Sequence, residues 1–231
     1  MLEIKNITFG YNSHNKIIDG LNLEFNEGGI YGLLGKNGTG KSTLLYLIMG
    51  LLQPQAGSVT MDGVNTTDRN PEIMKDMFIV PEEYDLPSIS LKSYINSLKP
   101  FYPNFDEQTM NECLQMFDMP TDINLGSLSM GMKKKVYMCV ALATHTKLLL
   151  MDEPTNGLDI PSKSQFRKVV ARGIREDQII IISTHQVRDV ELLLDHVTII
   201  DDQKVLFNDR LNVEEPVNLE ELFLKALENN K

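Results

Sequence analysis

The 231-residue sequence has no tryptophan and only two cysteines, Cys113 and Cys139. Neither cysteine belongs to a CxxC pair or stands at zinc-ligand spacing from a histidine, so the sequence gives no support for a zinc site or a redox motif. Two cysteines are also too few for a disulfide framework, and such low usage is typical of a reducing compartment. The chemistry of this protein must therefore lie in other residue types.

Long hydrophobic runs are absent as well. The nearly unbroken apolar run over residues 44–52 is far shorter than the roughly 18 residues that a membrane span requires. The first ten residues alternate polar and apolar side chains and lack the basic, apolar and small-residue regions of a signal peptide. We expect the chain to stay in the cytoplasm unless a partner holds it at a membrane.

Positive charge is scarce. The chain has 22 Lys and Arg against 32 Asp and Glu, which gives a formal net charge of -10. This balance argues against a nucleic-acid partner or an anionic membrane surface, because both require a basic surface. Lys133, Lys134 and Lys135 form a short basic cluster, which we expect to be a solvated helix face.

The apolar residues follow two patterns that indicate the fold class. Residues 2–9 and 21–25 alternate polar and apolar, as in half-buried strands of an antiparallel layer. Four later runs are continuous and rich in Ile and Leu, as in parallel strands covered on both faces. Since helical spacing separates these runs, we predict an α/β fold with a mainly parallel sheet, helices around it and an N-terminal antiparallel β layer. The four runs span residues 30–35, 147–151, 178–183 and 196–200.

Helical spacing dominates two further segments. Between about residues 86 and 146, strand-like runs give way to helical spacing, which predicts a helical subdomain inserted into the α/β core. From about 218 to 229, apolar residues recur at helical spacing behind Asn218, a suitable N-cap, so we expect a C-terminal helix that docks on the core. No internal repeat or low-complexity segment appears, so residues 1–231 read as a single domain.

A phosphate-binding motif stands between a predicted strand and a predicted helix. Residues 35–42 read GKNGTGKS and fit G-x-x-x-x-G-K-[ST] of P-loop NTPases in the required strand-loop-helix context. Glycines let successive backbone N–H groups point at phosphate oxygens, and the helix N-terminus adds partial positive charge. We expect Lys41 to bridge the β- and γ-phosphates and Ser42 to ligate Mg²⁺. The predicted phosphate-binding residues are Gly35, Asn37, Gly38, Thr39, Gly40, Lys41, Ser42 and Thr43.

An acidic pair follows a second predicted strand. The run KLLLMDEPTNGLD places Asp152 and Glu153 at the carboxyl end of this strand. Near a phosphate loop, Asp152 is expected to act as the Walker-B acid that holds Mg²⁺. Glu153 is then placed to orient or deprotonate the attacking water. The alternative, an acidic pair that only faces solvent, is disfavoured by the presence of the phosphate loop.

With these motifs, the sequence resembles the nucleotide-binding subunits of ABC transporters, of an exporter-like kind, over essentially its whole length. That family carries an LSGGQ-type signature at the start of a helix, and residues 128–132 read LSMGM. Ser129 and Gly131 match the signature, whereas Met130 and Met132 depart from it. The resemblance implies that Ser129 and Gly131 contact the γ-phosphate bound by a second ATPase subunit. Taken alone, LSMGM would indicate only a serine N-cap.

Further positions match in family order. The resemblance places Tyr11 where an aromatic ring stacks on adenine, and Asp159 in the loop that passes between the two subunits. His185 matches the histidine that touches the γ-phosphate, so together with Lys41 and Glu153 it is expected to be catalytic.

One position departs from the family pattern. Glu82 occupies the place of a glutamine that usually senses Mg²⁺ and the transmembrane partner. A carboxylate of this length can itself bind Mg²⁺. We therefore expect Glu82→Gln to keep ATP binding and at least part of the ATPase activity.

The resemblance implies an ATPase subunit with ATP and Mg²⁺ as its ligands. We expect it to pair with a second ABC ATPase chain, either identical or similar, and to power a separate transmembrane permease from the cytoplasmic face of the cell membrane. The transported substrate is recognised by the permease and is not encoded here. Two alternatives remain: a soluble ABC ATPase that acts without a membrane partner, and a scaffold that binds ATP without cleaving it.

Overall fold

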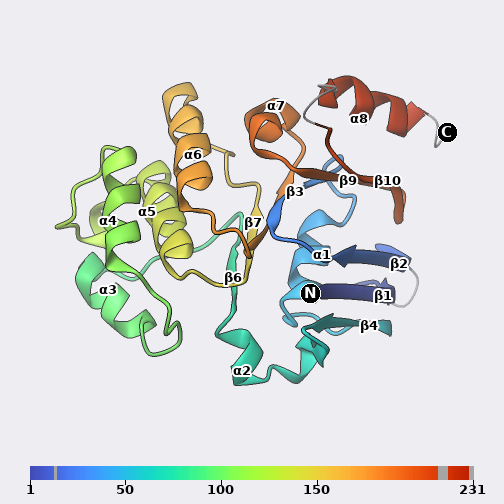
Figure 1. Ribbon diagram of the computed structural model, residues 1–231, viewed down its shortest axis with the longest axis horizontal. Coiled ribbons are helices and arrows are strands. Elements are labelled where there is room, and N and C mark those ends of the chain that lie inside the picture. Colours follow the sequence, from blue (N-terminus) through green and yellow to red (C-terminus); the bar gives the residue numbers. More distant parts are fainter. Residues whose placement is uncertain (13–14, 213–217, 229–231) are drawn as a thin grey trace.

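The computed structural model describes residues 1–12, 15–212 and 218–228, which form two β-sheets with surrounding helices (Figure 1). The smaller sheet is antiparallel and has the strand order β2-β1-β4-β5. It confirms the predicted antiparallel layer. Its strands are β1 (Leu2–Phe9), β2 (Ile18–Phe25), β4 (Ala56–Met61) and β5 (Val64–Asn65).

The larger sheet has the strand order β10-β9-β3-β8-β7-β6. Its neighbouring strands run parallel except for β9 and β10, which are antiparallel, so the predicted mainly parallel sheet is confirmed. The carboxyl ends of the parallel strands meet at one edge, where ligand sites of such sheets lie. The strands are β3 (Gly29–Leu34), β6 (Met77–Val80), β7 (Leu148–Asp152), β8 (Ile179–Thr184), β9 (His196–Asp201) and β10 (Lys204–Arg210).

The helices surround the larger sheet on both faces. One of them, α1 (Lys41–Ile48), buries its apolar side chains in the same core as residues of both sheets, so it lies between the sheets. The other α-helices are α2 (Pro71–Met74), α3 (Leu91–Leu98), α4 (Glu107–Met116), α5 (Met130–Ala143), α6 (Ile160–Gly173), α7 (Val187–Val190) and α8 (Leu219–Glu228). Short 3-10 helices span Thr66–Asp68, Leu125–Ser127 and Glu191–Leu193.

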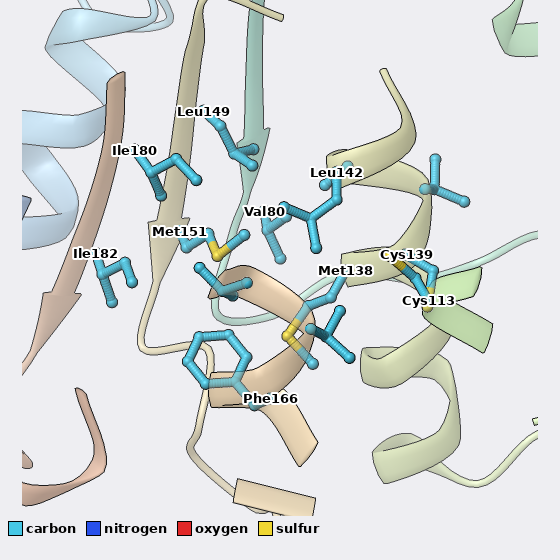
Figure 2. Packing of buried hydrophobic residues seen from close by; sticks show 14 of the residues in the cluster. Val80, Cys113, Met138, Cys139, Leu142, Leu149, Met151, Phe166, Ile180 and Ile182 are labelled. Atoms are coloured by element: carbon cyan, nitrogen blue, oxygen red, sulfur yellow. The ribbon is translucent and has the colours of Figure 1, made fainter. Parts of the chain in front are cut away.

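The central strands are buried on both faces because alternate side chains enter two separate cores. In β7, Leu149 and Met151 join a core with α4, α5 and α6, whereas Leu148 and Leu150 join the core with α1 and the antiparallel sheet. Figure 2 shows the first core, with side chains from the sheet facing those of the helices. This two-sided burial explains the continuous apolar runs in the sequence.

The helices α3, α4 and α5 occupy the segment 86–146 and gather on one side of the molecule, away from the antiparallel sheet (Figure 1). Each begins with a polar side chain that accepts a hydrogen bond from the first turn. Ser90 accepts from the N–H of Ser93 at 3.1 Å in α3, and Asp106 accepts from the N–H of Thr109 at 3.0 Å in α4. Ser129 plays the same part in α5. These caps satisfy N–H groups that have no partner within the helix.

The predicted C-terminal helix corresponds to α8, and the side chain of Asn218 accepts a hydrogen bond from the N–H of Glu221 at 3.1 Å. Leu219 and Leu227 are buried, so this helix packs against the rest of the protein. Residue 229, the last of the predicted helix, lies outside the described residues. No helix among the described residues is long and apolar enough to cross a membrane.

Sequence patterns did not predict β4, β6 or β10. β4 begins with the small residues Ala56 and Gly57, which carry little strand signal, and β6 has only 4 residues. β10 is a half-exposed strand at the sheet edge, so its sequence, KVLFNDR, lacks a continuous apolar run. All three strands become evident only from their pairing with neighbours.

Candidate nucleotide-binding site

The phosphate loop connects β3 to α1 and is folded tightly around its own backbone. A Cβ atom at Gly35 would lie 2.7 Å from the carbonyl oxygen of Ile200, so only glycine fits there. Gly40 has a φ of 96°, in the left-handed region, and caps α1 without a side chain. The hydroxyl of Thr39 donates to the carbonyl of Lys36 at 2.9 Å. The first N–H groups of α1 thus remain free of helical partners beside the loop, as an anion site requires.

Lys41 places a buried ammonium group at the centre of this loop. Its Nζ atom donates to the carbonyl oxygens of Gly35 at 2.9 Å and Lys36 at 3.0 Å. The same atom lies 3.5 Å from Oε1 of Glu153. The loop therefore holds its cation in position through its own backbone, next to the predicted catalytic carboxylate.

Asp152 ends β7 as a buried carboxylate with two hydroxyl partners. Its Oδ1 atom accepts from the hydroxyl of Ser183 at 2.5 Å, and the side chain of Ser42 also hydrogen-bonds to it. Burial raises the pKa of Asp152, which these hydrogen bonds oppose, and the nearby charges of Glu82 and Glu153 raise it further. A nearby cation would stabilise the ionised form of a carboxylate in these surroundings.

Glu153 is a buried carboxylate held by several donors. Its backbone has a φ of 44°, a strained value for a residue other than glycine. Thr184 donates to Oε2 at 3.0 Å. His185 contacts Oε1 through its backbone N–H at 3.1 Å and its ring Nδ1 at 2.8 Å. Lys41 and His185 thus approach the same carboxylate oxygen.

Glu82 lies on the loop after β6 and faces the same space. Its Oε1 atom accepts from Nδ2 of Asn156 at 2.8 Å. Together with residues of the phosphate loop, it lines a pocket of about 280 Å³. The apolar Ile17 in the pocket wall was not predicted, since it belongs to no motif. The predicted residues that line the pocket are Asn37, Gly38, Gly40, Lys41, Ser42, Thr43, Glu82 and Glu153.

Tyr11 lies beside the phosphate loop. Its hydroxyl is 3.3 Å from the hydroxyl of Thr43, and its ring packs edge-on against Phe9 at 5.1 Å between centroids. The residue is 64% exposed. The structure therefore leaves a large part of this ring accessible next to the phosphate loop.

The remaining predicted residues, Ser129, Gly131 and Asp159, are not part of the pocket lining. Ser129 is exposed at the start of α5, where its hydroxyl accepts from the N–H of Met132 at 3.4 Å, and Gly131 has open space around it. Asp159 is exposed and caps α6 by accepting from the N–H of Ser162 at 2.9 Å. Hydrogen bonds from the hydroxyl and the N–H of Ser162 lower the pKa of Asp159.

The prediction that the lysine cluster forms a solvated helix face is wrong for Lys134. This residue is only 8% exposed, and its Nζ atom donates to the carbonyl oxygens of Asn156 at 2.9 Å and Glu153 at 3.2 Å. Burial lowers the pKa of Lys134, while the charges of nearby acids oppose this shift. Lys135 is partly buried and donates to Gln165 at 3.2 Å. Lys134 and Lys135 thus attach α5 to neighbouring segments.

Several residues that support the site were not predicted from the sequence. Ser183 and Thr184, at the end of β8, hold Asp152 and Glu153 through their hydroxyl groups. Two hydroxyl residues directly after a buried apolar strand were an available signal, because polar groups at that sheet edge face the site. Asn156 carried no such signal, because its partners come from distant parts of the sequence.

Comparisons with known proteins agree with this geometry. Residues 18–156, more than half of the chain, match the ABC transporter family model. The chain is 31% identical over 212 residues to the bacitracin transport ATP-binding protein BcrA of Bacillus licheniformis. This alignment covers 89% of this chain and 68% of that protein. It is 28% identical over 229 residues to the ABC transporter ATP-binding protein YtrB of Bacillus subtilis, and this alignment covers 97% of this chain and 75% of that protein.

A solved structure shares the fold. The structure titled as an ATP-binding subunit of an ABC transporter superposes with a TM-score of 0.84 at 22% identity, over 98% of this chain and 99% of that one. The phosphate loop, the buried acidic pair and these relatives lead to one conclusion. The chain belongs to the ABC transporter family, as an ATP-binding subunit.

Proposed function

We propose that this subunit hydrolyses Mg-ATP at the pocket around Lys41, with Glu153 as the general base. The observation that carries the proposal is the buried Glu153 carboxylate, 3.5 Å from the Lys41 ammonium and 2.8 Å from the His185 ring. A base for phosphoryl transfer must stand beside the cation that binds the terminal phosphates, and this pair meets that requirement.

Phosphate binding rests on the loop and the start of α1. The free N–H groups of the first helical turn and the positive end of the helix dipole favour an anion there. The ammonium of Lys41 has carbonyl partners that a phosphate oxygen can replace, since a charged acceptor forms the stronger hydrogen bond. The exposed ring of Tyr11 beside Thr43 is available to stack on adenine.

Ser42, Asp152 and Glu82 are the residues that would hold Mg²⁺. All three present oxygen atoms, the ligands that this ion prefers, and the raised pKa of Asp152 supports a site that favours a cation. When bound, the ion would neutralise charge on the phosphate oxygens. Ser183 keeps Asp152 oriented through its hydrogen bond.

The contacts of Glu153 suggest how ATP itself prepares the base. Lys41 and His185 both contact its Oε1 atom, so this oxygen is occupied by two donors in the absence of nucleotide. A γ-phosphate attracts the same ammonium and the same ring. Its arrival therefore draws both donors away from Glu153 and leaves this carboxylate free to orient water and accept a proton. Thr184 continues to hold the other oxygen.

A second ATPase chain is expected to complete the site. Ser129 and Asp159 are exposed, Gly131 is partly exposed, and none of the three lines the pocket of its own chain. Pairing of two chains about a two-fold axis would bring these residues of one chain over the phosphates bound to the other. ATP then acts as a ligand that favours the closed dimer, and its hydrolysis releases the closure.

A groove near the end of α3 is the surface that we assign to the permease. It has a volume of about 610 Å³ and includes the prolines Pro100 and Pro103 and the ring of Phe101, which is 68% exposed. An exposed aromatic ring in a groove is typical of a protein contact site. A cytoplasmic segment of a membrane permease is the expected occupant, which would hold the subunit at the cytoplasmic face of the membrane. Movement of the helices α3, α4 and α5, acting as a subdomain, would then reach the permease.

Two experiments test this function. Phosphate release from ATP by the purified chain should stop when EDTA removes Mg²⁺ and return when Mg²⁺ is added; hydrolysis that is indifferent to EDTA would contradict the proposed site. Purification of the tagged chain from detergent-solubilised membranes should recover a polytopic membrane protein, and Phe101→Ser should lose this partner while keeping its ATPase activity. Recovery of soluble partners alone would indicate a soluble ABC ATPase instead.

A further inference from the structure

A row of polar side chains crosses the carboxyl ends of three neighbouring strands. The strands β6, β7 and β8 are adjacent and parallel, so the loops that follow them lie side by side. Glu82 follows β6, Asn156 follows β7 and Gln186 follows β8. The sheet therefore brings together residues that are far apart in the sequence.

These three residues form a continuous chain of hydrogen bonds. Nδ2 of Asn156 donates to Oε1 of Glu82 at 2.8 Å, and Oδ1 of Asn156 accepts from Nε2 of Gln186 at 2.8 Å. Oε1 of Gln186 accepts from Nζ of Lys163 at 2.9 Å, and that ammonium also pairs with Asp189 at 2.7 Å. The chain thus begins at a carboxylate and ends at an ammonium.

The charges at the two ends fix the direction of both amides between them. A carboxylate only accepts hydrogen bonds and an ammonium only donates them. The amide of Asn156 must therefore turn its NH₂ group to Glu82, which leaves its oxygen for Gln186. Each link is charge-assisted or polarised by its neighbour, which strengthens the whole chain.

The backbone of Asn156 is tied to two further parts of the site. Its carbonyl oxygen accepts from Nζ of the buried Lys134 at 2.9 Å, and its N–H donates to the carbonyl of Glu153 at 3.1 Å. Lys134 lies on α5, the helix that Ser129 begins. Asn156 therefore contacts the loop of Glu82, the loop of the predicted base, the loop after His185 and the signature helix.

We propose that Asn156 is a positioning residue that holds Glu82, Glu153 and Gln186 in register at the γ-phosphate end of the pocket. The proposal rests on the ATPase function proposed above. It also accounts for the unusual Glu82: an acceptor-only side chain at this position is matched by the NH₂ group of Asn156. A displacement of Glu82 is thus passed through Asn156 to the loop of Glu153, to which Lys134 of α5 is also bonded.

The test replaces the donor in the hydrogen bond from Asn156 to Glu82 with an acceptor. Asn156→Asp places a carboxylate against Glu82 and should lower kcat at least about tenfold, because it replaces a hydrogen bond to a charged group with repulsion. KM for ATP should change less than about threefold, since the phosphate loop is untouched. In the double variant with Glu82→Gln, the introduced amide donates to the introduced carboxylate, so kcat should return to within about threefold of Glu82→Gln alone. Asn111→Asp, the same change at an exposed position of α4, is the control and should leave kcat unchanged.

A second readout is independent of hydrolysis. Urea unfolding without nucleotide or Mg²⁺ should show a lower midpoint for Asn156→Asp and a recovered midpoint for the double variant. Should Asn156→Asp fail to fold, Gln186→Glu removes the donor at the other side of Asn156 and should also lower kcat about tenfold. Wild-type ATPase activity with no loss in Asn156→Asp, or a loss that Glu82→Gln does not repair, would overturn the inference. An inactive wild type would instead contradict the proposed function.

Discussion

The two groups of predicted site residues differ in how the chain holds them. Lys41 and His185 both contact Glu153, and the three residues lie at the carboxyl edge of the central sheet. Ser129 and Asp159 are exposed, and each accepts a hydrogen bond from the helix that it caps. The fold of one chain thus fixes the residues around Glu153. Ser129 and Asp159 instead have polar groups that another molecule can contact. In the proposed mechanism, one chain supplies the catalytic groups of the site and a second chain covers the bound phosphates.

The largest expected effect is a loss of kcat on substitution of Glu153. Glu153→Gln keeps the shape of the side chain but removes the base, so kcat should fall about 10² to 10⁴-fold. ATP binding should remain, because Lys41 and the phosphate loop are intact, and the variant should accumulate as a dimer in ATP. Phosphate release and size-exclusion chromatography measure the two effects. Unchanged turnover would remove Glu153 from its role.

The next prediction separates two roles of the exposed Ser129: capping α5 and contacting the phosphate of a partner chain. Ser129→Ala and Asp106→Ala each remove a helix cap and should each lower the free energy of unfolding by about 1 kcal/mol. Only Ser129→Ala should also lower kcat, by about tenfold or more, because its hydroxyl would contact the phosphate of a partner chain. Equal kcat values for the two variants would show that Ser129 is a cap and nothing else.

A smaller effect is expected at the connection between the two groups. Lys134→Met leaves the carbonyl oxygens of Glu153 and Asn156 without their buried donor, so the free energy of unfolding should fall by about 1 to 3 kcal/mol. Lys133→Met, at the neighbouring and more exposed position of the same helix, should change it by less than about 0.5 kcal/mol. Chemical denaturation compares the two variants, and similar values would contradict the buried role of Lys134.

The smallest effect concerns pH. Hydrogen bonds from Thr109 lower the pKa of Asp106 to about 2, below its ordinary value of 3.8. The ionised form is therefore favoured by folding, so its contribution is present above about pH 4 and is lost as the pH falls toward 2. The difference in unfolding free energy between wild type and Asp106→Ala should shrink over this range, to below about 1 kcal/mol at the partly exposed site. A difference that is constant with pH would contradict this account.

The sequence predicted those features that follow from local patterns. The phosphate loop, the acidic pair after β7 and the doubly buried strands each leave a signal within a short stretch of residues. The support from Ser183 and Asn156 arises only when β6, β7 and β8 pair, which no local pattern records. The lysine cluster shows the same limit: Lys134 is charged and was expected in solvent, but the loop after β7 folds over it and supplies two carbonyl partners.

The central claim is that a second ATPase chain completes the site, and mixing two inactive variants tests this most directly for a pair of identical chains. Lys41→Ala removes the phosphate-binding cation, and Ser129→Arg blocks the exposed signature with a bulky charge. In a mixed dimer, one site combines the intact phosphate loop of one chain with the intact signature of the other. If half of the dimers are mixed, the mixture should recover about a quarter of wild-type ATPase activity, while each variant alone stays inactive. A mixture as inactive as its components would contradict a site shared between two copies of this chain.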